Sequence, residues 1–475
     1  MIRQKESQLS QGRSPTLLEA LVTVFIVASV IILSIRLQSG LVSAFLPLTL
    51  AVGVVGVLSF YLRQPWESFL KGIFSGVSKI TIAVLILLLI GALVGVWIQG
   101  GIIPTLVFYG LQVISPSFFL PTTFVVCLIM SLVTGSSFGT IGTAGVALIG
   151  VQAGLGIGAP ITAGAILSGA YFGDKMSPLS DTTNIAAAIG EADLFRHIRS
   201  MMYTTIPAAV VTFFLLWIVG GASGPIEDIQ LNQMLDGLNR GWNIHIFHFI
   251  PLLLMLIMAL KKVPTLLLLF INVIFGAIWA MIFQRISLAQ VFVVATVGFK
   301  SKTGVQSVDQ VLNRGGMTSM QEVVILVLIA GALGGALHAT GVLEALVKGM
   351  LRWIRRTGTL IAVVLVSCYI FILFTGNQAL TLILVGQMFL PAFKQRRIDS
   401  TVLTRSLEDS ATLSAPLVPW SVAGGFCSQM LGVPTVKYLP YVWFAFAVPV
   451  FSLLLGYTGI AVWKAANDGA EEKSS

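Results

Sequence analysis

The sequence predicts an all-α polytopic membrane protein with about 10 transmembrane helices, and three observations lead to this fold class. Of the 475 residues, 56% are hydrophobic and only 10% are charged, whereas soluble domains carry about 25% charged residues. The mean hydropathy is +0.95, as expected for a chain in extensive contact with lipid. The apolar runs have about the length that a helix needs to cross a bilayer (~20 residues), and not that of the ~10-residue alternating strands of a barrel.

Ten apolar runs are candidates for membrane-spanning helices. They cover residues 17–37, 41–62, 80–98, 159–189, 199–220, 244–260, 263–283, 321–340, 400–430 and 438–463. Two further apolar stretches, 117–151 and 359–393, are interrupted by the polar, glycine-containing clusters TGSSFGT and TGNQALT. Their arms are short for a full crossing. We therefore expect two re-entrant hairpins, because non-helical backbone at membrane depth is tolerated where it lines a cavity.

The distribution of Lys and Arg predicts the orientation of the chain. With the N-terminus in the cytoplasm, most basic loops fall inside, and the uncharged segment 99–116 and the mostly acidic segment 221–243 fall outside. Only the 284–320 loop carries its basic residues on the other side. Because short cytoplasmic loops are enriched in Lys and Arg, we expect both termini in the cytoplasm.

An internal repeat predicts two structural units. Residues 91–114 align with residues 331–354 with nine identities in 24 positions. An odd number of crossings separates the two units, so their topology should be inverted, as in many secondary transporters. The predicted domains are a cytoplasmic tail (1–16), a first inverted repeat (17–220, with hairpin 117–151 and broken helix 159–189), an external loop (221–243), a second inverted repeat (244–463, with hairpin 359–393 and broken helix 400–430) and a second cytoplasmic tail (464–475).

Each hairpin is followed by a helix with a polar, proline-containing interruption. The first is GAYFGDKMSPLSDTTNIAAA at 169–188, and the second is LEDSATLSAPLVPWS at 407–421. Proline removes a helical hydrogen bond and clashes with the carbonyl one turn back. Freed carbonyls, hydroxyls and carboxylates are the ligands that a dehydrated hard cation prefers. Both interruptions should therefore meet the hairpin tips near the bilayer midplane and form an ion site.

The candidate site residues follow from this arrangement. The predicted ion- and proton-binding residues are Asp174, Ser177, Asp181, Thr182, Thr183, Asn184, Glu408 and Asp409. Within this set, Na⁺ is expected at Asp174, Asp181, Thr182 and Asn184. The predicted hairpin tips are Thr134, Gly135, Ser136, Ser137, Thr375, Gly376 and Asn377. Lys175 could neutralise an aspartate or meet an anionic substrate, and His338 could carry a proton.

Simpler interpretations compete with these roles. Asp174 and Lys175 could form a surface pair at a helix end, and Asp181 could cap the helix that follows it. Glu408 could form a salt bridge at the cytoplasmic face, where several arginines precede it. His338 could be an ordinary buried histidine in a helix of small residues.

The motifs TGSSFGTIGTAG, AGAILSGAYFGDKMSPLSDTTNIA and LEDSATLSAPLVPW resemble those of the NhaC family of bacterial sodium/proton antiporters. The resemblance covers most of the chain, and it extends to a wider ion-transporter superfamily that includes divalent-anion/sodium symporters. It implies a candidate ion site at Asp174, Ser177, Asp181, Thr182, Thr183 and Asn184, with Asp409 opposite. One branch of the family exchanges sodium-lactate for protonated malate, so the resemblance leaves the substrate open.

We therefore expect a secondary transporter that exchanges Na⁺ for protons by alternating access, and not an enzyme. The alternative is an organic-acid or amino-acid transporter coupled to sodium or protons. An intramembrane hydrolase would need a nucleophile and a base that we cannot assemble, and the inverted broken helices disfavour a channel. No cofactor and no nucleic acid are expected, because there is no Walker A sequence and the basic residues lie in short loops. The expected partners are Na⁺, H⁺, the lipid bilayer, a small organic anion as a further candidate, and a second copy in a homodimer.

Overall fold

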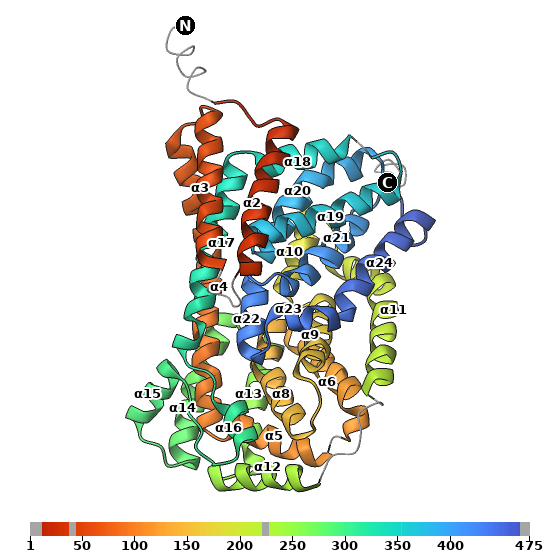
Figure 1. The fold of residues 1–475 in the computed structure, drawn as a ribbon. Coiled ribbons are helices and arrows are strands. Elements are labelled where there is room, and N and C mark those ends of the chain that lie inside the picture. Colours follow the sequence, from red (N-terminus) through yellow and green to blue (C-terminus); the bar gives the residue numbers. More distant parts are fainter. Residues whose placement is uncertain (1–11, 38–43, 114, 221–227, 353, 466–475) are drawn as a thin grey trace, which may run out of the picture.

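The computed structural model describes residues 12–37, 44–113, 115–220, 228–352 and 354–465, and their regular structure is helical (Figure 1). The only β-pairing among them is one isolated antiparallel bridge between Ile398 and Lys464. Most of the two predicted cytoplasmic tails (1–16 and 464–475) lies outside the described residues.

The first half of the chain runs from α2 to α11. Its helices are α2 (Leu17–Leu37), α3 (Phe45–Tyr61), α4 (Trp66–Gln99), α5 (Ile102–Val113), α6 (Phe119–Thr134), α7 (Ser137–Thr140), α8 (Val146–Gly154), α9 (Ala159–Met176), α10 (Asp181–Ile189) and α11 (Leu194–Gly220). A five-residue π-helical turn, η3 (Ile141–Gly145), joins α7 to α8.

The second half runs from α12 to α24. Its helices are α12 (Asp228–Gly241), α13 (Ile250–Leu260), α14 (Thr265–Phe283), α15 (Leu288–Val297), α16 (Gln306–Leu312), α17 (Gln321–Ala339), α18 (Val342–Leu351), α19 (Thr357–Thr375), α20 (Gln378–Gln395), α21 (Ser400–Leu407), α22 (Val422–Leu431), α23 (Thr435–Tyr438) and α24 (Trp443–Thr458). A π-helical turn, η6 (Glu408–Thr412), and a 3₁₀ turn, η7 (Ala415–Leu417), separate α21 from α22.

The helices make the chain a polytopic membrane protein. Within the described ranges, seven helices are long and apolar enough to cross a membrane, or nine if two bent pairs are counted as spans. The ten expected spans included four segments that are not among these nine: the two broken helices and the runs 17–37 and 41–62. Three of the seven are segments that the sequence assigns to hairpin arms, residues 116–134 and 137–154 in the first hairpin and α19 in the second, so the expectation of short arms is wrong for these three. Length alone therefore does not distinguish a re-entrant arm from a span.

Helix α4 is longer than the sequence predicted, with 34 residues in place of the run 80–98. The added N-terminal turns contain charged residues such as Glu67, which lower the hydropathy without preventing a helix. In Figure 1, α4 passes from α3 and α17 at one end of the molecule to α14 and α15 at the other. It packs closely on α17, because a Cβ on Gly76 would lie 2.1 Å from the carbonyl oxygen of Gly331. Small residues allow two helices in a membrane to approach in this way.

Two segments predicted as loops contain helices. The external loop 221–243 includes α12, and the bend between residues 232–241 and 246–260 is 86°. The 284–320 loop includes α15 and α16 and is tied together by Asp309, whose carboxylate accepts hydrogen bonds from Ser301 and Thr303. Partial burial by itself would raise the pKa of Asp309, but these hydrogen bonds keep it below its ordinary value.

Each hairpin tip packs against the helix break that follows it in the chain. The first tip turns at Gly135 (φ +66°), and a Cβ there would lie 2.7 Å from the Cβ of Leu179 in the first break. The second tip turns at Gly376 (φ +60°), whose carbonyl accepts a hydrogen bond of 2.9 Å from the backbone N–H of Val422 after the second break. The left-handed conformation is one that glycine adopts without strain. These contacts bring four non-adjacent segments together.

Candidate functional site

The first break lies between α9 and α10, over residues Ser177 to Ser180. The hydroxyl of Thr183 donates to the carbonyl of Lys175 (3.0 Å), and the amide of Asn184 donates to the carbonyls of Pro178 (3.0 Å) and Ser180 (2.7 Å). The last carbonyls of a helix have no partner within it. Side chains of α10 thus satisfy carbonyls at the end of α9 and in the break.

Asp174 lies in the last turn of α9 and is 6% exposed. Its carboxylate accepts two short hydrogen bonds, from the hydroxyl of Ser137 to Oδ2 (2.6 Å) and from the hydroxyl of Ser180 to Oδ1 (2.6 Å). Ser137 comes from the tip of the first hairpin and Ser180 from the first break. Two separate elements thus support one buried carboxylate, and the alternative of a surface pair between Asp174 and Lys175 is wrong.

Lys175 joins the first break to the second. Its ammonium lies 2.8 Å from Oδ1 of Asp409, and both side chains are fully buried. It also donates to the hydroxyl of Thr205 (3.1 Å), and Thr204 donates to the same oxygen of Asp409 (2.9 Å). Of the two roles considered for Lys175, the structure shows the neutralisation of an aspartate. Burying two ions is costly, so this pair must be held by more than its mutual attraction.

The second break begins in the π-helical turn η6, and π-turns within α-helices occur frequently at functional sites. Glu408 and Asp409 are fully buried there. Oε2 of Glu408 accepts a hydrogen bond from Thr412 (2.7 Å), while Oε1 of Glu408 and Oδ2 of Asp409 have no hydrogen-bond partner among the described residues. The alternative of a cytoplasmic salt bridge for Glu408 is wrong, because this side chain is fully buried and belongs to none of the ion pairs among the described residues.

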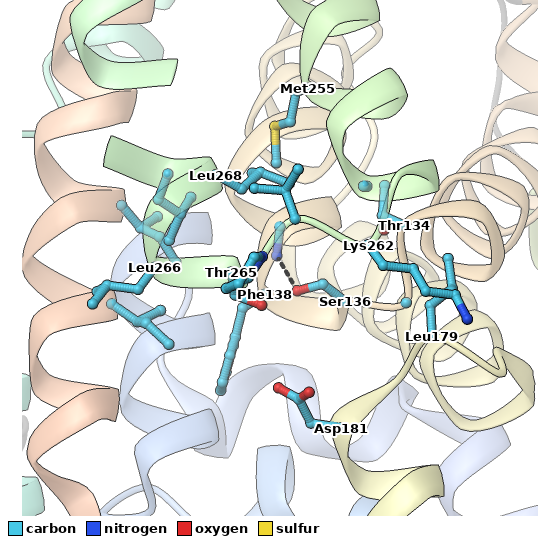
Figure 2. Close-up of a pocket in the computed structure, with 18 of the residues that line it drawn as sticks. Thr134, Ser136, Phe138, Leu179, Asp181, Met255, Lys262, Thr265, Leu266 and Leu268 are labelled. Atoms are coloured by element: carbon cyan, nitrogen blue, oxygen red, sulfur yellow. Dashed lines mark hydrogen bonds between the residues drawn. The ribbon is translucent and has the colours of Figure 1, made fainter. Parts of the chain in front are cut away.

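A cavity of about 490 Å³ lies where these segments meet. Both hairpin tips and both breaks contribute to its walls: Gly135, Ser136, Ser137, Asp174, Ser180, Asp181, Thr182, Asn184, Asn377, Gln378 and Ala415 all line it. An adjoining cavity of about 560 Å³ reaches the turn between α13 and α14. Figure 2 shows the carboxylate of Asp181 on one side of this second cavity, with Ser136 and Lys262 on other sides.

Asp181 differs from Asp174 in its surroundings. Its side chain is exposed and accepts no hydrogen bond from any other described residue. The N-cap of α10 is Ser180, and no side chain caps the helix, so the capping role considered for Asp181 is wrong. A carboxylate without a partner beside a buried carboxylate, with the Thr182 hydroxyl and the Asn184 amide oxygen nearby, offers the oxygen ligands that a hard cation takes.

The remaining predicted residues divide into two groups. Thr375 and Thr381 lie with their hydroxyl oxygens 3.1 Å apart within the second hairpin, and Asn377 caps α20 by accepting from the N–H of Leu380 (2.9 Å). His338 lies elsewhere: it is exposed at the end of α17 and contacts Glu344 at 2.5 Å. The expectation of a buried histidine is wrong, because α17 turns this side chain outward. His338 also does not line either cavity.

Several residues of the site lie outside the set predicted from the sequence. These are Ser180, Thr204, Thr205 and Thr412, which contact the four acidic and basic groups, and Lys79, Lys262 and Thr265, which line the cavities. Thr204 and Thr205 lie in an otherwise ordinary span. Their spacing from Ser200 on one helical face is a signal that could have identified them.

Comparison with known proteins shows the family. The profile of the Na⁺/H⁺ antiporter family matches residues 169–460. The malate-2H⁺/Na⁺-lactate antiporter of Bacillus subtilis is 36% identical over 463 residues, which cover 96% of this chain and 97% of that protein. The Na⁺/H⁺ antiporter NhaC of Alkalihalophilus pseudofirmus is 38% identical over 424 residues, which cover 89% of this chain and 92% of that protein. The chain therefore belongs to the Na⁺/H⁺ antiporter family and is a membrane transporter, not an enzyme.

One solved structure is similar at a much lower level. The structure of Neisseria gonorrhoeae MtrF superposes with a TM-score of 0.40 and 12% sequence identity, covering 91% of this chain and 97% of that one. Similarity of this degree carries no argument about the site or its substrate.

Proposed function

We propose that the chain exchanges Na⁺ for protons and holds the cation at the first break, between Asp174 and Asp181, with oxygen atoms of Thr182 and Asn184. The observation that carries this proposal is the carboxylate of Asp181, which has no partner within the described part of the chain and lines, with Asp174, a cavity to which both hairpin tips and both breaks contribute. Family membership supports the same exchange.

The chemistry of a buried carboxylate explains how one site serves two ions. An uncompensated charge is costly away from water, so a carboxylate such as Asp174 is stabilised either by a cation or by a proton. Its hydrogen bonds from Ser137 and Ser180 hold the group in place in both states. Na⁺ is the transported substrate here, so it needs ligands that bind it only transiently.

The exposed face of α10 supports access to this site from one end of the molecule. Asp181, Asn184 and Ala188 are exposed and lie three and four residues apart, on one face of the helix. That face leads toward the ion pair of Glu191 with Lys394 (2.8 Å). This end carries the basic loops for which a cytoplasmic position is predicted. We infer that the site is open to the cytoplasm in this conformation, in the inner membrane of a bacterium.

The movement that exposes the site to the other side would involve the two predicted inverted repeats, 17–220 and 244–463. Each hairpin tip packs on its own break, so a hairpin and its broken helix can move as one body against helices such as α4 and α17. A homodimer built on these outer helices remains a prediction.

A second candidate function is the exchange of a small organic acid together with Na⁺ or protons. The two cavities, of about 490 and 560 Å³, are larger than a single Na⁺ requires, and Lys79 and Lys262 line their walls. Lys175 is committed to Asp409, so an organic carboxylate would meet Lys79 or Lys262 instead. The name of the Bacillus subtilis relative agrees with this candidate.

Transport in proteoliposomes distinguishes the two functions. The full chain is reconstituted with an acidic lumen and an internal pH dye, and NaCl, KCl, malate or lactate is added outside. We expect NaCl alone to collapse the pH gradient, and Asp174→Asn to abolish this response. Asp236→Asn, which changes an exposed carboxylate on α12, is the matched control and should behave as the unsubstituted chain. If NaCl has no effect unless malate or lactate is present, the second candidate is the function.

A further inference from the structure

Two arginines line a cavity at the start of α11, far along the chain from the first break. The cavity measures about 240 Å³, and the residues that line it are Arg196, Arg199, Ser200, Tyr203, Thr401 and Trp463. None of these residues lines the two cavities at the first break. Since a water molecule occupies about 30 Å³ in the liquid, the cavity has room for a polar group several times that size.

Backbone contacts hold the wall of this cavity in place. The segment that follows α24 runs along the start of α21, where the N–H of Asp399 donates to the carbonyl of Trp463 (2.9 Å). Two residues further, the N–H of Ala465 donates to the carbonyl of Arg397 (2.9 Å). The ring of Trp463 lies edge-on to the ring of Tyr203, with 5.5 Å between the centroids. Trp463 is therefore fixed in the wall by the backbone on either side of it.

Three side chains that line the cavity carry hydrogen-bond donors without acceptors. The guanidinium of Arg199, the hydroxyl of Tyr203 and the indole N–H of Trp463 form no hydrogen bond or ion pair with another residue in the described ranges. Arg196, in contrast, is paired with Asp399 (2.8 Å). Free N–H and O–H donors around an arginine bind anions, and their hydrogen bonds to a charged acceptor are the strong ones. The cavity therefore favours an anion over a cation.

Arg405 adds a positive charge behind the wall. It is fully buried, donates through Nη1 to the carbonyl of Ala461 (3.0 Å), and lies 5.8 Å from the centre of the Trp463 ring. Its Nε and Nη2 have no hydrogen-bond partner among the described residues. Asp409, one helical turn further along, is already paired with Lys175. Because a buried charge without a counter-ion is costly, Arg405 is a second, independent indication that an anion binds here.

The cavity adjoins the lipid-facing side of α11. Tyr203 is 45% exposed, and Ile206 and Val210 continue the same helical face, each at least 42% exposed. Of the seven apolar spans in the described ranges, α11 is the least buried. Tyrosine and tryptophan are enriched at the level of lipid headgroups. A lipid with its headgroup in the cavity would place its acyl chains along this exposed face.

We propose that this cavity binds the phosphate-bearing headgroup of a negatively charged phospholipid. Arg199, Tyr203 and Trp463 donate hydrogen bonds to the phosphate oxygens, and Arg405 contributes its charge from behind the wall. The cavity lies at the end of the molecule for which a cytoplasmic position is predicted. Basic pockets between membrane-spanning helices on that side bind such headgroups. Binding of the lipid does not depend on which ion is transported.

A lipid accounts for more of the site than two other anions do. Free phosphate would meet the same donors, but would leave the apolar face of α11 next to them uncovered. The tail of the chain carries Asp468, Glu471 and Glu472, and these carboxylates would likewise leave that face uncovered. Both anions are therefore included in the test as competitors.

The test measures the binding of phosphatidylglycerol to the full chain, purified without lipid in a neutral detergent, by native mass spectrometry. We expect one site of higher affinity than the rest. Arg199→Gln should weaken this site by about ten-fold or more, since it removes a hydrogen bond between charged groups. The matched control is Arg356→Gln, which changes an exposed arginine just before α19 that does not line the cavity. It should change the affinity by less than about two-fold.

A second variant and a measurement of folding separate binding from structure. Trp463→Phe keeps an aromatic ring but removes the indole N–H, and it should weaken the same site by about three-fold or more. Arg199 is exposed and has no ion pair in the described ranges, so Arg199→Gln should leave the unfolding temperature in lipid-free detergent unchanged. A lower unfolding temperature together with the lower affinity would show a structural role and would overturn the proposal.

Three further arms identify the ligand. Phosphatidylcholine, whose choline neutralises the phosphate charge, should bind about ten-fold more weakly than phosphatidylglycerol. Inorganic phosphate in excess should not displace the lipid. The full-chain variant Asp468→Asn/Glu471→Gln/Glu472→Gln should bind phosphatidylglycerol within about two-fold of the unsubstituted chain.

Other results contradict a lipid site. Equal affinity for the two lipids, or equal losses in Arg199→Gln and Arg356→Gln, would show that the cavity does not select a charged headgroup. Displacement by inorganic phosphate would show a site for free phosphate. Tighter lipid binding in the tail variant would show that the tail of the chain is the occupant.

Discussion

The two helix breaks of this transporter use the same architecture for different electrostatic environments. At the first break, Asp174 is held by two hydroxyls and Asp181 is exposed to a cavity. At the second break, Glu408 and Asp409 are fully buried, and Asp409 is paired with the ammonium of Lys175. The first break is open and hydroxyl-lined, and the second is closed and ionic.

The two hairpin tips share one local backbone plan. Each tip turns at a left-handed glycine and continues into a residue that caps the next helix, Ser136 in one hairpin and Asn377 in the other. The backbones of the two tips are therefore alike, and the two breaks differ in the charges beside them. Because Lys175 comes from the end of α9 but neutralises Asp409, the second break keeps one carboxylate without a cationic partner among the described residues, Glu408, whereas the first keeps two, Asp174 and Asp181.

The largest effect that distinguishes the breaks should be on stability. Lys175→Met leaves Asp409 buried without a partner, and breaking a buried ion pair typically costs about 3–5 kcal/mol. The double variant Lys175→Met/Asp409→Leu should recover most of this loss, because no charge remains uncompensated, but should not transport. Thermal unfolding in detergent measures both. If Lys175→Met is as stable as the unsubstituted chain, the second break does not depend on the Lys175–Asp409 ion pair.

Cation binding should show the next largest effect. Asp174→Asn removes a charge next to the proposed cation while keeping hydrogen-bonding capacity toward Ser137 and Ser180, and it should weaken ²²Na⁺ binding by roughly 100-fold. The double variant Lys175→Met/Asp409→Leu should change binding by about three-fold or less, because it removes both charges of a pair that lies outside the cation cavity. Equilibrium binding to purified protein compares the two. Equal losses would mean that both breaks bind the cation.

Glycine substitution at the two tips gives a smaller contrast. Both tips have positive φ, so Ala costs about 1–2 kcal/mol in either. At Gly135 the new methyl would also lie 2.7 Å from the Cβ and 2.8 Å from the carbonyl carbon of Leu179, whereas at Gly376 its nearest neighbour is the Cβ of Ala330 at 3.0 Å. Gly135→Ala should therefore displace the first break and lower Na⁺ affinity by about ten-fold. Gly376→Ala should mainly lower the unfolding temperature. A larger loss of Na⁺ affinity in Gly376→Ala than in Gly135→Ala would contradict the placement of the cation at the first break.

The smallest effect concerns Asp181. Its carboxylate makes no hydrogen bond within the described structure and is exposed, so Asp181→Asn should leave the unfolding temperature unchanged. Na⁺ affinity should fall by about ten-fold, less than for Asp174→Asn, because water screens an exposed charge. Asp236→Asn provides the control for an exposed carboxylate on α12. An unchanged affinity for Na⁺ in Asp181→Asn would restrict the site to Asp174.

Local sequence signals were sufficient to predict much of the architecture. The interruption at Ser177–Ser180 follows from a proline and a run of short polar residues, and the tips at Gly135 and Gly376 follow from glycine between apolar arms. The start of α4 was missed, because charged residues in its first turns lower the hydropathy that identifies a span. The helices in the 284–320 loop were missed because they are short: α15 is apolar but has only 10 residues, and α16 has seven residues, several of them polar.

The membrane class, the family motifs and the identity of the carboxylates follow from the amino-acid sequence, because they depend on composition and on neighbours along the chain. The pairing of the charges depends instead on how distant segments pack. Lys175 and Asp409 are 234 residues apart (409 − 175) and meet only because α9 and η6 pack together. The same packing buries Glu408 and leaves Asp181 open to the cavity, whereas His338 faces outward. Burial and pairing are properties of contacts between distant segments, and for that reason no local pattern could predict them.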